Sequence, residues 1–66
     1  MMEKFILKSD SDFLHFEMGG IVTWHNINPE ALCAFDSKEE AQDIINEYDL
    51  ENTTIVKENF SETFFD

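Results

Sequence analysis

The side chains best suited to metal binding are two histidines, one cysteine and many carboxylates. His15 and His25 fall on opposite faces of the sheet that their hairpin predicts, so we expect them not to share an ion. Cys33 stands alone, without the C-x-x-C or H-x-x-x-H spacing of metal sites. Asp10 and Asp12 begin like a calcium loop, but the third ligand position holds a leucine. The sequence therefore predicts no metal site and no cofactor.

Catalytic groups are equally sparse. A nucleophile needs a base within hydrogen-bond reach, and an acid–base pair needs a sheltered cleft that separates its two pKa values. The serines and threonines stand mostly at predicted turn, cap and strand positions. His15 is expected opposite Trp24 on the neighbouring strand, where a cross-strand polar–aromatic pair explains both residues without a site. We therefore expect a protein that is not an enzyme.

The length and the cysteine count bound the class of protein. A chain of 66 residues forms at most one small domain with a thin stability margin. The single cysteine excludes an internal disulfide. The apolar run near the N-terminus is too short for a signal peptide or a membrane span. These features predict a soluble protein of a reducing compartment, the cytoplasm.

Charge is the strongest feature of the composition. Fifteen Asp and Glu residues face four Lys residues, which gives a formal net charge of −11 at pH 7. Such a chain is a poor direct ligand for nucleic acid or for an anionic membrane surface. Hydrophobic residues nevertheless make up 42% of the chain and include seven Phe, which a disordered acidic chain would lack. We expect a folded acidic domain.

Alternating apolar residues predict four β-strands. They are expected near residues 4–9, 13–18, 21–25 and 53–58. Gly19-Gly20 is typical of a two-residue hairpin loop, and such a loop pairs Met18 with Ile21. In this register four apolar side chains share the core face: Leu14, Phe16, Met18 and Ile21.

Two helices are predicted between the hairpin and the last strand. Asn28-Pro29-Glu30-Ala31 is typical of a helix start and predicts one or two helical turns. The main helix is expected near residues 38–48, because Ser37 and Glu40 form an S-x-x-E capping box. Its apolar stripe consists of Ala41, Ile44, Ile45 and Tyr48, and Leu50 should close its end.

The resulting element order is β-β-β-α-α-β. It predicts an α+β fold in which one main amphipathic helix packs on one face of a small antiparallel sheet. Residues 1–58 are expected to form a single domain. Residues 59–66 are expected to form an aromatic-acidic C-terminal tail.

The main helix carries acids along one side. Asp36, Glu40, Asp43 and Glu47 recur at steps of four, three and four residues, with Glu39 beside them. Acids near the helix N-terminus are favoured by its dipole, whereas like charges at i, i+4 cost about 0.2 to 0.5 kcal/mol per pair. A stripe of one sign therefore indicates an anionic functional surface, with a merely solvated face as the alternative. The acids along one helix are spaced more widely than the phosphates of a DNA duplex, so this helix by itself cannot mimic the charge density of DNA.

The tail contains three phenylalanines, Phe60, Phe64 and Phe65, and two acids, Glu62 and Asp66. Glu58, the last residue of the predicted strand, adds a third acid to this aromatic-acidic segment. Two interpretations stay open. The tail either folds back over the sheet or the helices, or serves as a docking peptide or dimer contact, because three exposed phenylalanines would otherwise invite aggregation.

One stretch of the chain runs from Phe35-Asp36-Ser37-Lys38-Glu39-Glu40-Ala41 through Ile44-Ile45 to Thr54-Ile55-Val56. It resembles small accessory proteins encoded by bacteriophages and prophages. Such proteins pair an N-terminal hairpin with a helix of this type and a return strand, here over residues 3–58. The resemblance implies inhibition of host enzymes, such as defence nucleases or transcription factors, through their basic surfaces. It would place the protein in the host cytoplasm.

These observations predict a non-enzymatic acidic binding protein, an inhibitor or modulator that occupies a basic, nucleic-acid-binding surface of a host protein. The candidate contact residues are Asp36, Glu39, Glu40, Asp43, Glu47, Phe60, Phe64 and Phe65. The alternative is a structural or assembly protein, such as a homodimer, that self-associates through the sheet edge or the Phe-rich tail. A small-ligand or metal-binding module ranks third.

Overall fold

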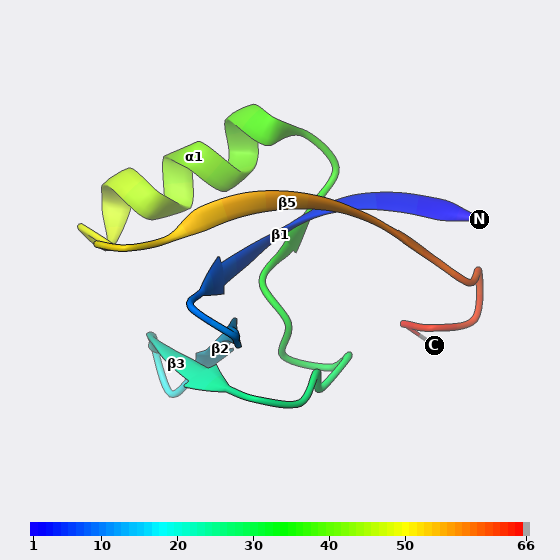
Figure 1. Cartoon of the computed structure of the whole chain (residues 1–66), viewed down its shortest axis with the longest axis horizontal. Coiled ribbons are helices and arrows are strands. Elements are labelled where there is room, and N and C mark those ends of the chain that lie inside the picture. Colours follow the sequence, from blue (N-terminus) through cyan, green and yellow to red (C-terminus); the bar gives the residue numbers. More distant parts are fainter. Residues whose placement is uncertain (66) are drawn as a thin grey trace.

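The computed structural model describes residues 1–65, so Asp66 of the predicted tail lies outside the described residues. Within residues 1–65 the chain forms a five-stranded antiparallel sheet and one α-helix, which is the predicted α+β fold (Figure 1). The elements are β1 (Met2–Ser9), β2 (Asp12–Glu17), β3 (Gly20–Trp24), β4 (Ala34–Phe35), α1 (Lys38–Glu47) and β5 (Thr54–Phe60).

Strand β1 is the centre of the sheet. The last strand, β5, pairs with β1 over its whole length, from Met2 opposite Phe60 to Lys8 opposite Thr54. The other edge of β1 is shared, because β4 pairs with its middle and β2 pairs only with its end. Strand β3 then pairs with β2, so β2 and β4 lie along one edge of β1 and β5 lies along the other edge.

The β2–β3 hairpin is shifted from the predicted register. Its two-residue loop is Met18-Gly19, so Glu17 pairs with Gly20 and Phe16 with Ile21, and the predicted pairing of Met18 with Ile21 is wrong. Moving the loop by one residue moves each pairing by two positions, which leaves every strand side chain on its predicted face. Met18 itself leaves the sheet, with 99% of its surface exposed, instead of facing the core.

The segment after Asn28, predicted to form one or two helical turns, forms only a single turn and no separate helix in the part of the chain that the structure describes. The carbonyl of Asn28 accepts hydrogen bonds from the N–H groups of Ala31 and Leu32, so a single turn forms and then stops. After this turn the chain is extended. Strand β2 pairs with β1 only at its first two residues, so the backbone groups of its later residues are free to bond with residues 31–33. Phe16 N–H donates to the Ala31 carbonyl and Cys33 N–H donates to the Leu14 carbonyl. Tertiary pairing thus overrides a sound local helix signal.

Helix α1 begins and ends as its sequence predicts. Ser37 is the N-cap, and its Oγ accepts the N–H of Glu40 at 3.2 Å. At the other end Asp49 has a positive φ of 52°, and Leu50 N–H donates to the Ile45 carbonyl at 3.0 Å. This is a Schellman-type ending, in which Leu50 also packs against the core.

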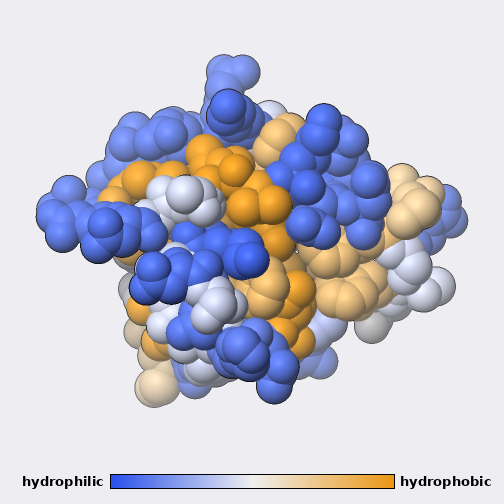
Figure 2. Space-filling view, in the orientation of Figure 1, coloured by the Kyte–Doolittle hydropathy of each residue, from blue (hydrophilic) through white to orange (hydrophobic). Residues whose placement is uncertain are grey.

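Both faces of the sheet are covered. The helix face has a core of Leu7, Leu14, Cys33 and Ala41, against which Ile44 and Ile45 pack as predicted. The opposite face has a second core of Ile6, Leu32 and Phe60, under the C-terminal turn that folds back on the side away from α1 (Figure 1). Figure 2 shows a hydrophobic band between hydrophilic borders on the side of the molecule turned to the viewer.

Candidate interaction surface

Four carboxylates lie on the outward side of α1. They belong to Glu39, Glu40, Asp43 and Glu47, all of which are exposed. Glu39, Asp43 and Glu47 follow each other at intervals of four residues, which aligns them along the helix. The buried Ala41 lies on the opposite side, so the core stripe and the acidic side do not overlap. We call these four residues the acidic face.

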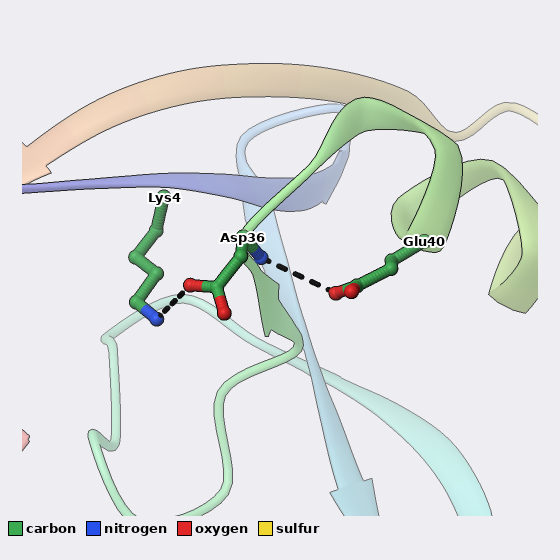
Figure 3. A network of polar contacts seen from close by, with 3 residues as sticks. All are labelled: Lys4, Asp36 and Glu40. Atoms are coloured by element: carbon green, nitrogen blue, oxygen red, sulfur yellow. Dashed lines mark hydrogen bonds and ion pairs between the residues drawn. The ribbon is translucent and has the colours of Figure 1, made fainter.

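Asp36 does not continue this face. Its carboxylate forms an ion pair with the ammonium group of Lys4 on β1, while its backbone N–H donates to Glu40 Oε2 at 3.4 Å (Figure 3). The Asp36 carboxylate therefore points toward the sheet and away from the Glu40 carboxylate. The predicted acidic line accordingly starts at Glu39 and Glu40, and Asp36 is compensated locally.

Most positive charges make contacts elsewhere in the molecule, whereas Lys38 is exposed in the first turn of α1 and forms no ion pair within residues 1–65. Among residues 1–65 the ion pairs join the N-terminus to Glu62, Lys4 to Asp36, His25 to Asp12, and Lys57 to Glu3. Lys8 lies over the Phe13 ring, 5.0 Å from its centroid. None of these contacts involves the acidic face. The last turn of α1 contains no basic residue, although the helix dipole favours one there.

The C-terminal tail packs on its own chain. β5 continues to Phe60, two residues past the predicted end of the strand, and a turn at Ser61 then brings Phe64 and Phe65 back. The ring of Phe60 stacks on Phe64 at 4.7 Å and meets Phe65 edge-on at 5.2 Å. Phe60 is only 8% exposed, against Ile6 and Leu32. Of the two interpretations of the tail, the structure has the one that folds back over the sheet.

His15 is fully buried and both of its ring nitrogens are occupied. Nδ1 lies 2.9 Å from the Phe13 carbonyl, which can only accept, and Nε2 lies 3.0 Å from the Asn28 N–H, which can only donate. These partners assign the neutral tautomer with its proton on Nδ1. The ring also contacts Trp24, with centroids 4.6 Å apart, although the residue directly opposite is Val22. His15 therefore ties the loop before β4 to the sheet.

The remaining reactive groups are the potential metal ligands and the single cysteine. Within residues 1–65 no group of three or more His, Cys, Asp or Glu side chains lies close enough to hold a metal ion. Cys33 is buried in the helix-face core, and this burial raises the pKa of its thiol to about 12. The thiol is therefore neutral near pH 7 and poorly nucleophilic.

One shallow cavity lies beside the tail. It measures about 270 Å³, and its walls are mostly apolar. The lining residues are Met2, Lys4, Leu32, Ala34, Glu62 and Phe65. Both charged residues at this cavity are already paired, Lys4 with Asp36 and Glu62 with the N-terminus.

Sequence reasoning missed a second exposed feature, at the hairpin tip. Met18 protrudes fully, and Phe16 is 38% exposed although it was expected in the core. Phe16 lies 6.3 Å from the ring of Tyr48 at the end of α1. Strand β2 ends at Glu17, and a predicted strand with this end would have placed Met18 in the exposed loop. The sequence instead favours Gly19-Gly20 as the loop, because two glycines are the stronger loop signal.

No protein-family model matches this chain, and no significant match was found among curated proteins or among solved structures. The likeness to phage accessory proteins therefore stays a prediction. Among residues 1–65, no helix has both the length and the apolar character that crossing a membrane requires.

Proposed function

We propose that this chain is a non-enzymatic binding protein that inhibits or modulates a basic partner protein. The acidic face of α1 occupies the surface with which that partner binds nucleic acid. One observation carries the proposal. Glu39, Glu40, Asp43 and Glu47 align on one exposed side, and none of them forms an ion pair within residues 1–65.

The energetics of α1 support this interpretation over a solvated surface. Asp43 and Glu47 repel each other at i, i+4, and Glu47 stands near the negative end of the helix dipole. A lysine at either position would stabilise the helix. A basic partner would supply the missing countercharge, and complementary potentials would speed association and select against acidic proteins.

The biological setting follows from the same proposal. A lone, shielded thiol suits a reducing cytoplasm, which would be the host cytoplasm if the chain is phage-encoded. In that setting a small acidic protein that covers a nucleic-acid-binding groove would act against a host defence nuclease or a transcription factor.

Self-association is the second candidate and draws less support. The outer edge of β5 is free of a strand partner within the described residues, but Lys57, Glu58 and Asn59 are exposed along it. Charged residues on an edge strand disfavour pairing with another copy. The aromatic tail packs internally, and two copies would bring together formal charges of −11 each.

The decisive experiment replaces Asp43 and Glu47 together by Lys. The immobilised parent chain first captures a partner from the native cell, which mass spectrometry identifies and which is then purified. We expect Asp43→Lys/Glu47→Lys to fold normally and to bind at least about tenfold more weakly, because two repulsive charges face a basic surface. Binding of the parent should fall steeply with ionic strength.

A charge-matched control separates a local surface from bulk charge. Glu30→Lys/Glu58→Lys changes the net charge by the same amount at two exposed positions outside the acidic face. It should retain most of the parent affinity. Equal affinity for the parent and the Asp43→Lys/Glu47→Lys variant would reduce the acidic face to solvated surface.

A further inference from the structure

The backbone at Met18 does not suit the residue that occupies it. Met18 and Gly19 form the β2–β3 loop with φ values of 50° and 80°, the combination of a primed turn. Such turns favour Asn, Asp or Gly at the first position. The other non-glycine residues with positive φ within residues 1–65 are Asp10, Asp49 and Asn52, which belong to the tolerant types. Only Met18 departs from this pattern.

Packing does not explain Met18 either. Its side chain is 99% exposed, so it adds nothing to either core. Within residues 1–65 the other large exposed hydrophobic residues are Met1 at the terminus and Phe16, two positions before Met18 in the same hairpin. Met18 thus fits neither its backbone nor a core, and together with Phe16 it forms an exposed apolar tip, the kind of surface that marks an interaction site.

The hairpin tip adjoins the end of the acidic face. Phe16 packs edge-on against Phe35 and lies against Tyr48, both at 6.3 Å between ring centroids. Tyr48 directly follows Glu47 and precedes the exposed Asp49. In Figure 1 the β2–β3 loop and the C-terminal end of α1 lie at the same end of the molecule, away from both termini. The exposed Glu17 adds a further acid beside Met18.

We infer that Met18 is the apolar anchor of the same docking surface. Its occupant is a basic protein whose basic surface encloses an apolar pocket for an unbranched side chain. This inference rests on the proposed function, and it adds an apolar contact at Met18 to the electrostatic contact of the acidic face. Charge complementarity selects this occupant. Glu17 is exposed next to Met18, and Glu47 and Asp49 flank Tyr48, whose ring lies 6.3 Å from Phe16. None of these three acids forms an ion pair within residues 1–65.

The two halves of the surface act on different rate constants. Exposed charges steer the encounter, so the acidic face sets the association rate and its dependence on salt. A desolvated apolar anchor holds the complex together, so Met18 sets the dissociation rate. The flexible, polarisable thioether adapts to the shape of a pocket better than a branched side chain does.

The test measures binding kinetics with the purified partner protein captured by the parent chain. Met18→Asn removes the anchor while placing a residue that tolerates positive φ in the loop, so the melting temperature should stay equal or rise. We expect dissociation to accelerate by about tenfold or more, with the association rate and its salt dependence unchanged. Ser11→Asn, at an exposed position in the β1–β2 turn, is the matched control and should leave both rates unchanged.

The outcomes separate this inference from the proposed function. If Met18→Asn dissociates as slowly as the parent, or if Ser11→Asn accelerates dissociation equally, the anchor is refuted. The proposed function still stands in that case, provided that Asp43→Lys/Glu47→Lys slows association. Faster dissociation of Met18→Asn with an unchanged Asp43→Lys/Glu47→Lys variant would support the anchor and refute the acidic face. Capture of no partner by the parent chain would contradict both.

Discussion

The two faces of the sheet are closed by different means. On one face α1 brings its own hydrogen bonds and caps, and it buries one stripe of side chains against Leu7 and Leu14. On the other face the cover consists of a loop and a turn without regular structure, and Phe60, Phe64 and Phe65 fill the space with their rings. A chain of 66 residues needs both cores, because a small domain buries a limited share of its surface.

This difference decides which face is free to carry a function. A helix separates its buried stripe from its outward side, so packing in the core does not constrain the residue types at Glu39 and Asp43. The aromatic tail has no such separation, because the same three rings that make it apolar also close the second core. Substitutions on the outward side of α1 should therefore affect binding, and substitutions in the tail should affect stability.

The largest effect on stability is expected from Phe60→Ala. This change removes a ring that is 8% exposed and contacts both Phe64 and Phe65, and it should cost about 3 to 5 kcal/mol in the free energy of unfolding. Urea unfolding followed by circular dichroism measures the loss. Thr63→Ala, at an exposed position in the turn that follows β5, should cost little. Equal stabilities of the two variants would mean that the tail does not close a core in solution.

A smaller loss is expected from His15→Leu on the same face. Leucine keeps the bulk of the ring but leaves the Phe13 carbonyl and the Asn28 N–H without their partner, at a cost of about 1 to 3 kcal/mol. His25→Leu is the control, because His25 is exposed and only pairs with Asp12. A chemical-denaturation series that ranks His25→Leu as the more damaging change would refute the assigned role of His15.

The strands and the main helix were predictable because each has a local cause. The alternation of apolar residues predicts β1, β2, β3 and β5, and the capping box at Ser37 starts α1 at the observed residue. The segment 31–35 was not predictable in the same way. Its extended form depends on backbone groups that β2 exposes only after it has diverged from β1. No local pattern encodes that divergence.

Part of the candidate surface was also predictable from the sequence, and part of it was not. Carboxylates must stay hydrated or paired, so a helical period alone placed Glu39, Glu40, Asp43 and Glu47 on the outside. The pairing of Asp36 with Lys4 joins residues 32 positions apart and needs the β1–β4 register. The tail was open to two interpretations because aromatic residues serve cores and interfaces alike. Met18 was misplaced because the loop begins one residue before the two glycines.

An alkaline titration tests the helix-face core. The pKa of the Cys33 thiol is raised to about 12 in the folded state by burial, from an ordinary value of about 9. Between these values the unfolded chain loses a proton that the folded chain keeps, so stability should fall as pH rises from about 9 to about 12. The slope should approach about 1.4 kcal/mol per pH unit. Cys33→Ala should lack this component, and identical pH profiles would contradict it.

The smallest expected effect on stability comes from charges on the outward side of α1, and its dependence on salt should distinguish it from the effects of substitutions in the two cores. At low ionic strength Asp43→Lys/Glu47→Lys should be more stable than the parent by about 0.5 to 1 kcal/mol, because it relieves like-charge repulsion and complements the helix dipole. Added sodium chloride should screen that repulsion, raise the melting temperature of the parent and narrow the difference. Phe60→Ala should keep the salt response of the parent, since it removes no charge. Should the parent and Asp43→Lys/Glu47→Lys respond to salt identically, the acidic face would be no site of stored repulsion, and a basic partner would have nothing there to relieve.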